Sequence, residues 1–467
     1  MTNTLTQEKV TQNLASLVAG LNYDTMPEEV TKAAKQHILD GLGNQIAASA
    51  IADQARIVQG LLAKWGGKEE STVVGYGHKI PAVNAAFVNA MMGHGVELDD
   101  AHGPALTKAG SSIVPSIFAA GEAEKADGKT LIAALVGGYE AAIRVGLAIN
   151  PSHRKRGYHT SGTAGTFGTA AATARVLGLD AEKTAWTIGT ASIQAAGIQA
   201  YLKSPSMVKP LSPGKAAFNG VLSAYLSREG LVGPVTALEN DEGWLKAFCD
   251  DAKVEELTRG HGTEWKILEV GYKPHAACRY AHGPIDCAQI MGKEKDIKAE
   301  DIESIKVTTC ELAFRQSGHK ECKNLNQAMG STPFGVALAL TRGDNSLGDY
   351  WKGFEEQVNH DIVEKVEMII DLEDPGMGVM GRAATVEINL KDGTTHTHRV
   401  EAPKGEPEVP MTDDELDEKF LGLARAVLPE DQVKKIFDLV KNLENVQDVS
   451  EISKLMVVAG GKPEFKG

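Results

Sequence analysis

The stretch "MPEEVTKAAKQHILDGLGNQIAA" (residues 26–48) decides the expected fold class. Pro27 and the two glutamates after it are typical of a first helical turn, where an amide hydrogen is not needed and negative charge is favourable. Apolar side chains then recur every three or four positions, at Val30, Ala33, Ala34, Ile38, Leu42 and Ile46. This spacing predicts a long amphipathic helix with one buried side.

The same helical spacing covers most of the first 240 residues. Further runs are found at 81–95, 114–126, 130–149, 163–177, 181–200 and 213–229. These runs predict a large all-α helical domain.

The period changes after about residue 262. "IESIKVTTC" (302–310) and residues 383–402 alternate apolar and polar side chains, the second around an Asp392-Gly393 turn. Helix-like runs lie at 281–293, 326–341 and 358–367, and helical spacing returns after "EAPKGEPEVPMTDDE" (401–415). We therefore expect an all-helical domain from residues 1–264 and 406–467, and a smaller α+β lid domain with a mainly antiparallel sheet from residues 265–405.

Composition and charge exclude several classes of protein. The 467 residues carry a net charge of −14, which argues against a protein that binds nucleic acid through clustered cations. The N-terminus lacks a basic region followed by an apolar core, and there is no long uninterrupted apolar run. We expect a soluble cytoplasmic protein that binds neither nucleic acid nor membrane. The five cysteines include no CxxC pair and are expected to be reduced and buried.

"HGVELDDAHG" (94–103) combines three acids and two histidines. A metal site would use these residue types, but the spacing is not HExxH, and we predict no metal. Acids held close together repel one another, which raises a pKa and creates a usable base. A helix end whose acids are solvated or pair with Lys108 remains the alternative.

The glycine-rich "GTAGTFGTAAATA" (162–174) could hold a phosphate or let two helices approach closely. Its spacing is GxxGxxG, with no strand before it and no Gly-Lys-Ser/Thr after it. We favour close helix packing.

Cations gather in three later segments. His159 precedes a predicted helix, Lys209 precedes a proline, and "GYKPHAACRYAHGPID" (271–286) contributes Lys273, Arg279 and His282. One interpretation of these basic residues is a structural salt-bridge cluster. The other is a pocket for a multiply charged carboxylate, in which acids abstract a proton and cations stabilise the charge that develops.

Four motifs carry a resemblance to a known family. They are "HGVELDDAH" (94–102), "GYHTSGTAGTFGTAAATARVLGL" (157–179), the segment from "MVKPLSPGKAAFNG" to Asn240 (207–240), and "YKPHAACRYAHGPIDCA" (272–288). Together they resemble the MmgE/PrpD family of 2-methylcitrate dehydratase, cis-aconitate decarboxylase and iminodisuccinate epimerase. The resemblance implies a helical domain built from both chain ends, an α+β lid, a homodimer, and no metal or organic cofactor.

The resemblance also implies a set of site residues. The family's pocket histidine matches His159, its lysines match Lys209 and Lys273, and its acidic motif matches Glu97, Asp99 and Asp100. Four positions depart from the decarboxylase pattern, because Glu97 replaces the aspartate that opens the acidic motif, Ala101 a threonine, Lys108 a histidine and Phe334 a tyrosine. The two lost hydroxyls alter what the site can donate to a substrate.

The leading hypothesis is a cofactor-independent lyase, of dehydratase or decarboxylase type, that abstracts an α-proton from a small di- or tricarboxylate. The predicted catalytic residues are Glu97, Asp99, Asp100, His159, Lys209 and Lys273. The predicted substrate-binding residues are Lys108, His102, Arg279, His282 and Tyr158. Two alternatives remain: an epimerase or racemase of an imino- or amino-dicarboxylate such as iminodisuccinate, and an inactive carboxylate-binding dimer.

Overall fold

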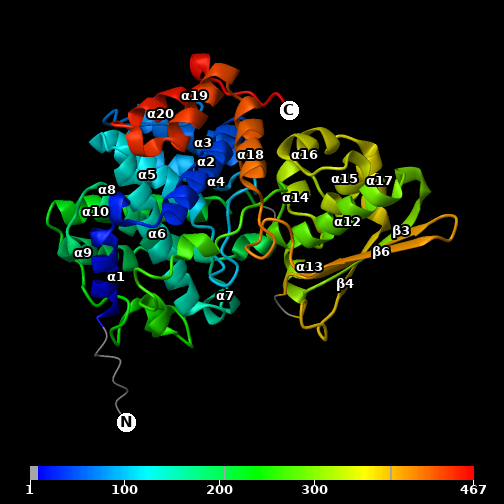
Figure 1. The fold of residues 1–467 in the computed structure, drawn as a ribbon, viewed down its shortest axis with the longest axis horizontal. Coiled ribbons are helices and arrows are strands. Elements are labelled where there is room, and N and C mark those ends of the chain that lie inside the picture. The colour runs from blue at the N-terminus through cyan, green and yellow to red at the C-terminus, as the bar shows by residue number, and fades with distance from the viewer. Residues whose placement is uncertain (1–8, 204–205, 379–380) are drawn as a thin grey trace, which may run out of the picture. The chain divides into compact units, whose positions relative to one another are not determined.

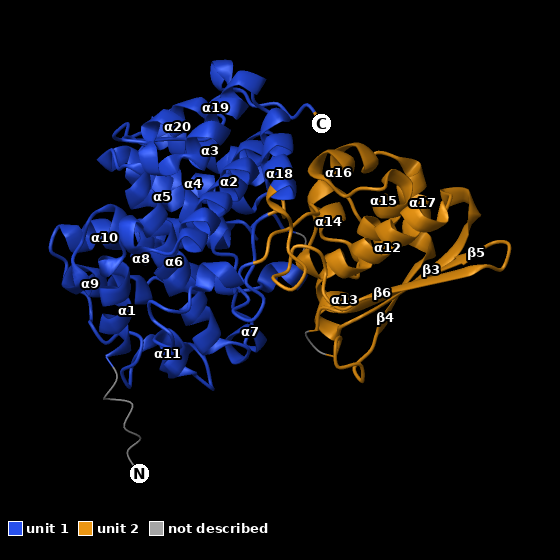
Figure 2. Ribbon diagram, viewed as in Figure 1, with its two compact units in different colours: residues 1–95, 99–270, 414–466 blue, residues 96–98, 271–413, 467 orange. Residues whose placement is uncertain are grey.

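The computed structural model describes residues 9–203, 206–378 and 381–467. The chain forms two compact units, one of residues 1–95, 99–270 and 414–466 and one of residues 96–98, 271–413 and 467 (Figure 2). Each unit is built from segments that are distant in the sequence.

The first unit is helical. Its longer helices are α1 (Val10–Gly20), α2 (Glu28–Ile51), α3 (Asp53–Trp65), α4 (Ala82–His94), α5 (Gly110–Glu124), α6 (Gly128–Ile149), α8 (Thr160–Val176), α9 (Ala181–Ser192), α10 (Leu211–Arg228), α18 (Asp413–Arg425) and α19 (Glu430–Lys441). The short ones are α7 (Ser152–Lys155), α11 (Trp244–Phe248) and α20 (Ser450–Leu455). α8 packs against α6 and α10 at the centre of this unit (Figure 1).

Glycines bring α6 and α8 into close contact. A Cβ added to Gly168 would lie 2.7 Å from the Cβ of Ala142 and 2.9 Å from the carbonyl of Gly138. A Cβ on Gly138 would lie 3.0 Å from the carbonyl of Gly168. The glycines of this stretch therefore allow close helix packing, as predicted from the sequence.

Among the described residues, α6 is long and apolar enough to cross a membrane by length and composition alone. However, 94% of its 18-residue apolar window is buried inside the structure. Core helices pass the same test, and α6 carries a buried Arg144–Glu140 ion pair with a 2.7 Å separation.

The C-terminal segment rejoins the first unit. α19 packs against α2, and α20 packs against α5 (Figure 1). The amide of Gly128 donates to the carbonyl of Val446 at 2.9 Å, and Lys35 Nζ donates to the carbonyl of Lys441 at 2.9 Å. Both ends of the chain thus contribute to one helical core.

The first unit also contains a strand pair that hydrophobic spacing did not predict. β1 (Ser71–Thr72) and β2 (Lys79–Ile80) form a two-stranded antiparallel sheet. The expectation of an all-α domain is wrong in this detail. Two-residue strands are too short to produce a visible alternation in the sequence.

The second unit combines one sheet with helices. Its elements are α12 (His282–Lys295), β3 (Ile302–Thr309), α13 (Glu311–Ser317), α14 (Leu325–Met329), α15 (Thr332–Arg342), α16 (Leu347–Gly353), α17 (Gln357–Lys365), β4 (Val366–Ile370), β5 (Ala384–Leu390) and β6 (Thr395–Val400). α12 packs against β5, β6 and α15, and α15 also packs against α17.

The sheet is mixed, with strand order β4-β3-β5-β6. β5 pairs antiparallel with β3 and with β6, whereas β4 pairs parallel with β3. The prediction of a mainly antiparallel sheet is confirmed only in part, because β4 is parallel to β3 and its first two residues fall within the helix predicted at 358–367. A five-residue apolar strand directly after a helix offers no period of its own, and its pairing with β3 is a tertiary effect.

Two predicted helices end or break earlier than expected. α9 stops at Ser192, and the chain then extends so that the carbonyl of Gly197 accepts from the amide of His159 at 3.0 Å. The run at 326–341 is two helices, since Ser331 caps α15 by accepting from the amide of Phe334 at 3.2 Å.

Candidate functional site

The acidic stretch follows α4 and is held in an unusual backbone conformation. Glu97 has φ = 54° and Leu106 has φ = 51°, both in the left-handed region that L-residues with side chains seldom adopt. Such conformations cost of order 1–3 kcal/mol and persist only where surrounding contacts impose them. The two residues bracket the segment that carries Asp99, Asp100 and His102, so this backbone is fixed by its contacts.

Asp99 is buried and holds two basic side chains. Its Oδ2 lies 2.7 Å from Nδ1 of His94 and its Oδ1 lies 3.3 Å from Nζ of Lys108. Both Asp99 and His94 are 1% exposed. Because each carboxylate oxygen already has a partner, Asp99 is placed to orient His94 and Lys108.

Asp100 lies next in the sequence but has a different set of partners. It accepts from the hydroxyl of Tyr139 and from the amide of Gly110 at 3.0 Å, and its Oδ2 lies 3.0 Å from Nδ1 of His37. Asp100 is 1% exposed. These contacts anchor the acidic stretch to α2, α5 and α6.

His102 closes the turn that follows. Its Nδ1 accepts from the amide of Ala105 at 3.0 Å, and its amide donates to the carbonyl of Thr107 at 3.0 Å. Its Nε2 lies 3.2 Å from Oε2 of Glu269. Hydrogen bonding from His102, followed by the contact with Lys266, lowers the pKa of Glu269 to about 2.

His159 is the N-cap residue of α8 and is 5% exposed. No described group forms a hydrogen bond with its Nδ1. Burial lowers the pKa of His159 well below its usual value, and His94, Arg154, Lys209 and Lys108 lower it further through their charge. A neutral imidazole among basic groups at a helix N-terminus is suited to meet an anion.

The rings around His159 fix its surroundings. The His94 ring centroid lies 6.2 Å away, and Tyr201 meets His159 edge-on at 5.6 Å. Tyr158, although adjacent in sequence, stacks on His153 at 4.5 Å and has no described contact with the His159 ring. Of the predicted residues in the first unit, His159, Lys209, Lys108 and Asp99 therefore belong to one cluster around His159.

Lys273 and Glu97 meet within the second unit. Lys273 is fully buried and its Nζ donates to the carbonyl of Glu97 at 2.8 Å, to the carbonyl of Ala277 at 3.2 Å, and reaches Oε2 of Glu97 at 3.5 Å. The lysine thus stabilises the left-handed backbone of Glu97. This pair joins the first and fourth of the predicted motifs.

Arg279 is bound to Glu406, a carboxylate that lies outside the four motifs. Its Nε donates to Oε1 of Glu406 at 2.8 Å, and its Nη1 donates to the carbonyl of Tyr272 at 3.0 Å. Arg382 contacts the second oxygen of Glu406 at 2.6 Å. A substrate carboxylate would have to compete with Glu406 for Arg279.

His282 and His275 lie beside this pair. His282 is buried at the start of α12, where burial and then the charges of Arg279, His275 and Lys273 hold its pKa well below the usual range. His275 is bound through Nε2 to Asp286 at 2.7 Å, and Asp286 also accepts from the amide of Lys404 at 2.7 Å. Within the second unit, basic side chains are therefore matched by local acceptors.

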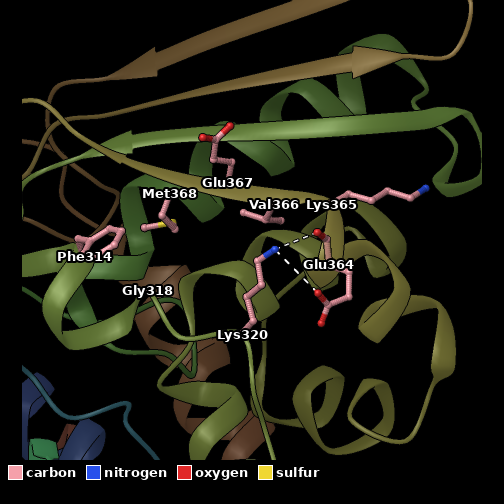
Figure 3. Close-up of a pocket in the computed structure, with 8 residues that line it drawn as sticks. All are labelled: Phe314, Gly318, Lys320, Glu364, Lys365, Val366, Glu367 and Met368. Atoms are coloured by element: carbon pink, nitrogen blue, oxygen red, sulfur yellow. Dashed lines mark hydrogen bonds and ion pairs between the residues drawn. The ribbon is translucent and has the colours of Figure 1, made fainter.

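A surface cavity of about 420 Å³ lies elsewhere in the second unit (Figure 3). It is lined by Phe314, Gly318, Lys320, Glu364, Lys365, Val366, Glu367 and Met368. Lys320 turns toward Glu364, to whose carbonyl it donates at 2.9 Å (Figure 3). None of the predicted site residues lines this cavity.

Over the described ranges, no group of three or more His, Cys, Asp or Glu side chains is arranged to hold a metal ion. In the acidic stretch the side chains of Asp99, Asp100 and His102 point to separate protein partners.

Comparison with known proteins places the chain in a family. The model of the MmgE/PrpD N-terminal domain matches residues 12–257, and that of the MmgE/PrpD C-terminal domain matches residues 275–445. The chain belongs to the MmgE/PrpD family.

Similar family members are named as decarboxylases. Cis-aconitate decarboxylase from Aspergillus terreus is 28% identical over 471 residues, which cover 96% of each chain. The human cis-aconitate decarboxylase is 26% identical over 96% of this chain and 95% of its own. The cis-aconitate decarboxylase-like protein oryM from Aspergillus oryzae is 28% identical over 98% of this chain and 99% of its own.

Four residues with clear roles in these contacts were absent from the predicted set. His94 was considered only as a metal ligand, although its spacing of five residues from Asp99 could have suggested a pair. His37, Tyr139 and Glu406 lie on distant segments, and no local pattern connects them to Asp100 or Arg279.

Proposed function

We propose that this chain is a lyase that acts on a small tricarboxylate of the cis-aconitate type. His159 carries the proposal, because it is buried at the start of α8 with an unpartnered Nδ1 and is surrounded by basic groups. A multiply charged carboxylate would supply the missing negative charge. The names of the similar proteins, which match along nearly the whole chain, support the substrate class.

The chemistry of this class requires stabilisation of negative charge next to a carboxylate. In a dehydration, a base takes the proton from the carbon next to a carboxylate before hydroxide leaves. In a decarboxylation, carbon dioxide leaves with its bonding electrons remaining on carbon, and an acid returns a proton there. Cations directed at the substrate carboxylates lower the barrier in both cases.

The predicted catalytic set divides into two roles under this proposal. His159 and Lys209 of the first unit are the candidates for direct contact with substrate, and Glu97 and Lys273 of the second unit remain predicted catalytic residues. Both carboxylate oxygens of Asp99, and both of Asp100, are already bonded to protein groups. These two acids therefore position other residues and are not candidates for direct contact with substrate. Lys108 is a candidate for substrate contact that keeps its bond to Asp99.

Arg279, His102, His282 and Tyr158 remain predicted substrate-binding residues. Arg279, His102 and His282 already make hydrogen bonds to protein groups that a substrate would have to displace, and Tyr158 would have to leave its stacking contact with His153. We therefore rank them below His159 and Lys209.

A ligand screen followed by turnover tests this function. Thermal shift with cis-aconitate, citrate, 2-methylcitrate and tricarballylate (propane-1,2,3-tricarboxylate) should show a raised melting temperature, since a ligand of the folded state stabilises it. Proton NMR in deuterated water should then show an unsaturated or decarboxylated product. Deuterium exchange into recovered substrate without carbon dioxide or water release would instead identify an epimerase. Binding without any turnover would identify a carboxylate-binding protein.

We also propose that the reaction needs no cofactor and that the protein is a cytoplasmic homodimer. Activity should survive dialysis against a chelator, and light scattering of the purified protein should give twice the mass of the 49.6 kDa chain. Fractionation of the source cells should recover it without detergent.

A further inference from the structure

We propose that Asp99 and His94 form a positioning pair that sets the protonation of His159, so that Asp99 acts through His94 and not as a base itself. This inference rests on the proposed function, because it assigns a protonation step to His159. It also removes Asp99 from the predicted acids that could abstract the proton.

The bond between Asp99 and His94 determines where the His94 proton lies. Nδ1 of His94 is 2.7 Å from Oδ2 of Asp99, and an ionised carboxylate only accepts hydrogen bonds. Nδ1 therefore carries the hydrogen, and in the neutral ring the lone pair is on Nε2. Lys108, at 3.3 Å from Oδ1, balances the charge of Asp99. Asp99 and His94 are both buried, so these bonds hold the His94 ring in place within the interior.

The His94 ring lies beside the ring that has an unpartnered nitrogen. The two centroids are 6.2 Å apart, with an angle of 49° between the planes. The groups that act on His159 are His94 from α4, Lys108 from the loop after it, Arg154 from α7 and Lys209 before α10, while Tyr201 meets the ring edge-on. Asp99 is bonded to two of these groups, His94 and Lys108.

The two members of the pair have opposite effects on His159. A second imidazole beside His159 competes for a proton, so removal of the His94 ring lets His159 bind a proton more readily. Asp99 offsets the positive charge on the two groups bonded to it, His94 and Lys108, so removal of its carboxylate makes His159 harder to protonate. A purely structural role for the pair would not produce shifts of opposite sign.

The pH dependence of tricarballylate binding measures these shifts. Calorimetry on the full-length wild type should show affinity falling as pH rises through the pKa of His159 in the complex. In His94→Asn this fall should move about one pH unit higher, and in Asp99→Asn about one unit lower, which is roughly a tenfold change in affinity at a fixed pH on the slope. His261→Gln, a half-buried histidine of the same unit that is bonded to the carbonyl of Leu257, should leave the pH dependence in place. Shifts of the same sign, or none, would overturn the pairing.

NMR of histidine-labelled protein tests the pair without any ligand. In the wild type the His94 ring should be in the Nδ1-H form, with a hydrogen-bonded proton that exchanges slowly with solvent. In His94→Asn, the His159 signals should approach the protonated form at a higher pH than in the wild type. If His94→Asn does not fold, His94→Gln replaces it. The tautomer of His94 in the wild type tests the proposal without either variant. An Nε2-H form of His94 contradicts the proposal.

The two measurements separate the two proposals. If tricarballylate and cis-aconitate do not bind while the NMR signature is present, the proposed function fails and the pair remains. If they bind and are turned over while pH dependence and tautomer are not as stated, the pair fails and the function remains.

Discussion

Two clusters of basic side chains differ in how their charge is balanced. Around His159 in the first unit, the groups acting on the ring are His94, Arg154, Lys209 and Lys108, and the ring has an unpartnered nitrogen. Around Arg279 in the second unit, Glu406 accepts from both Arg279 and Arg382. The basic side chains around Arg279 are thus bound by a local carboxylate, whereas those around His159 form the cluster that we propose receives an anion.

The largest expected effect follows from replacing His159. His159→Asn should lower kcat/KM for the tricarboxylate substrate by about 10³-fold, since acid–base groups contribute 10²–10⁴-fold. The melting temperature should change little, because Nδ1 makes no hydrogen bond to lose. Steady-state kinetics of this variant, with His261→Gln as the control, measures the loss. Full activity in His159→Asn would mean that the unpartnered ring has no part in the reaction.

The next effect concerns the cluster around Arg279. Glu406→Gln should lower the free energy of unfolding by about 3 kcal/mol, because it leaves two arginines short of a buried carboxylate. Glu408→Gln removes the exposed partner of Arg382 and should cost less than about 1 kcal/mol. Urea unfolding of both variants makes the comparison. Equal stability of the two variants would show that the bonds of Glu406 to Arg279 and Arg382 do not stabilise the fold.

A third effect tests the helix that carries His159. Gly168→Ala should destabilise the first unit by about 2 kcal/mol, because its Cβ would lie 2.7 Å from that of Ala142. Gly422→Ala on α18, where nothing lies within 4 Å, should be neutral or slightly stabilising. Thermal unfolding distinguishes them. Tolerance of Gly168→Ala would mean that α6 and α8 can separate at little cost.

The smallest effect is the pH dependence at Glu269. Its pKa is lowered from the usual 4.5 to about 2, so its stabilising contribution is present above 4.5 and is lost as pH falls toward 2. The side chain is 45% exposed, and the contribution should stay below about 1 kcal/mol. The free energies of unfolding of the wild type and of Glu269→Gln, measured at several pH values, should therefore converge at acidic pH. A constant difference would exclude the bond to His102 as its source.

Much of the fold could be predicted from hydrophobic spacing alone. The run beginning at Pro27 is α2, and the strands at 302–310 and 383–402 are β3, β5 and β6. β4 could not be found this way, because its pairing partner lies 61 residues earlier, at Ile305 opposite Val366. The pair β1–β2 was too short to show a period.

The candidate site was predictable in its residue types and only partly in its roles. His159 and Lys209 were predicted as catalytic and Lys108 as substrate-binding, and the charges of both lysines lower the pKa of His159. The partner of Arg279 could not be found from the motif, since Glu406 lies 127 residues further on. Family membership, suggested by four motifs, was confirmed by comparison over residues 12–257 and 275–445.

The sequence alone determined the helical and strand periods, the family and the chemical types available to the site. Only the tertiary structure decided what each residue does, as the neighbours Asp99 and Asp100 demonstrate. Asp99 holds His94 and Lys108, whereas Asp100 holds Tyr139 and His37. Consecutive side chains in a non-helical segment point in different directions, and His37 and Tyr139 come from α2 and α6. The role of a buried acid is therefore set by the helices that surround it.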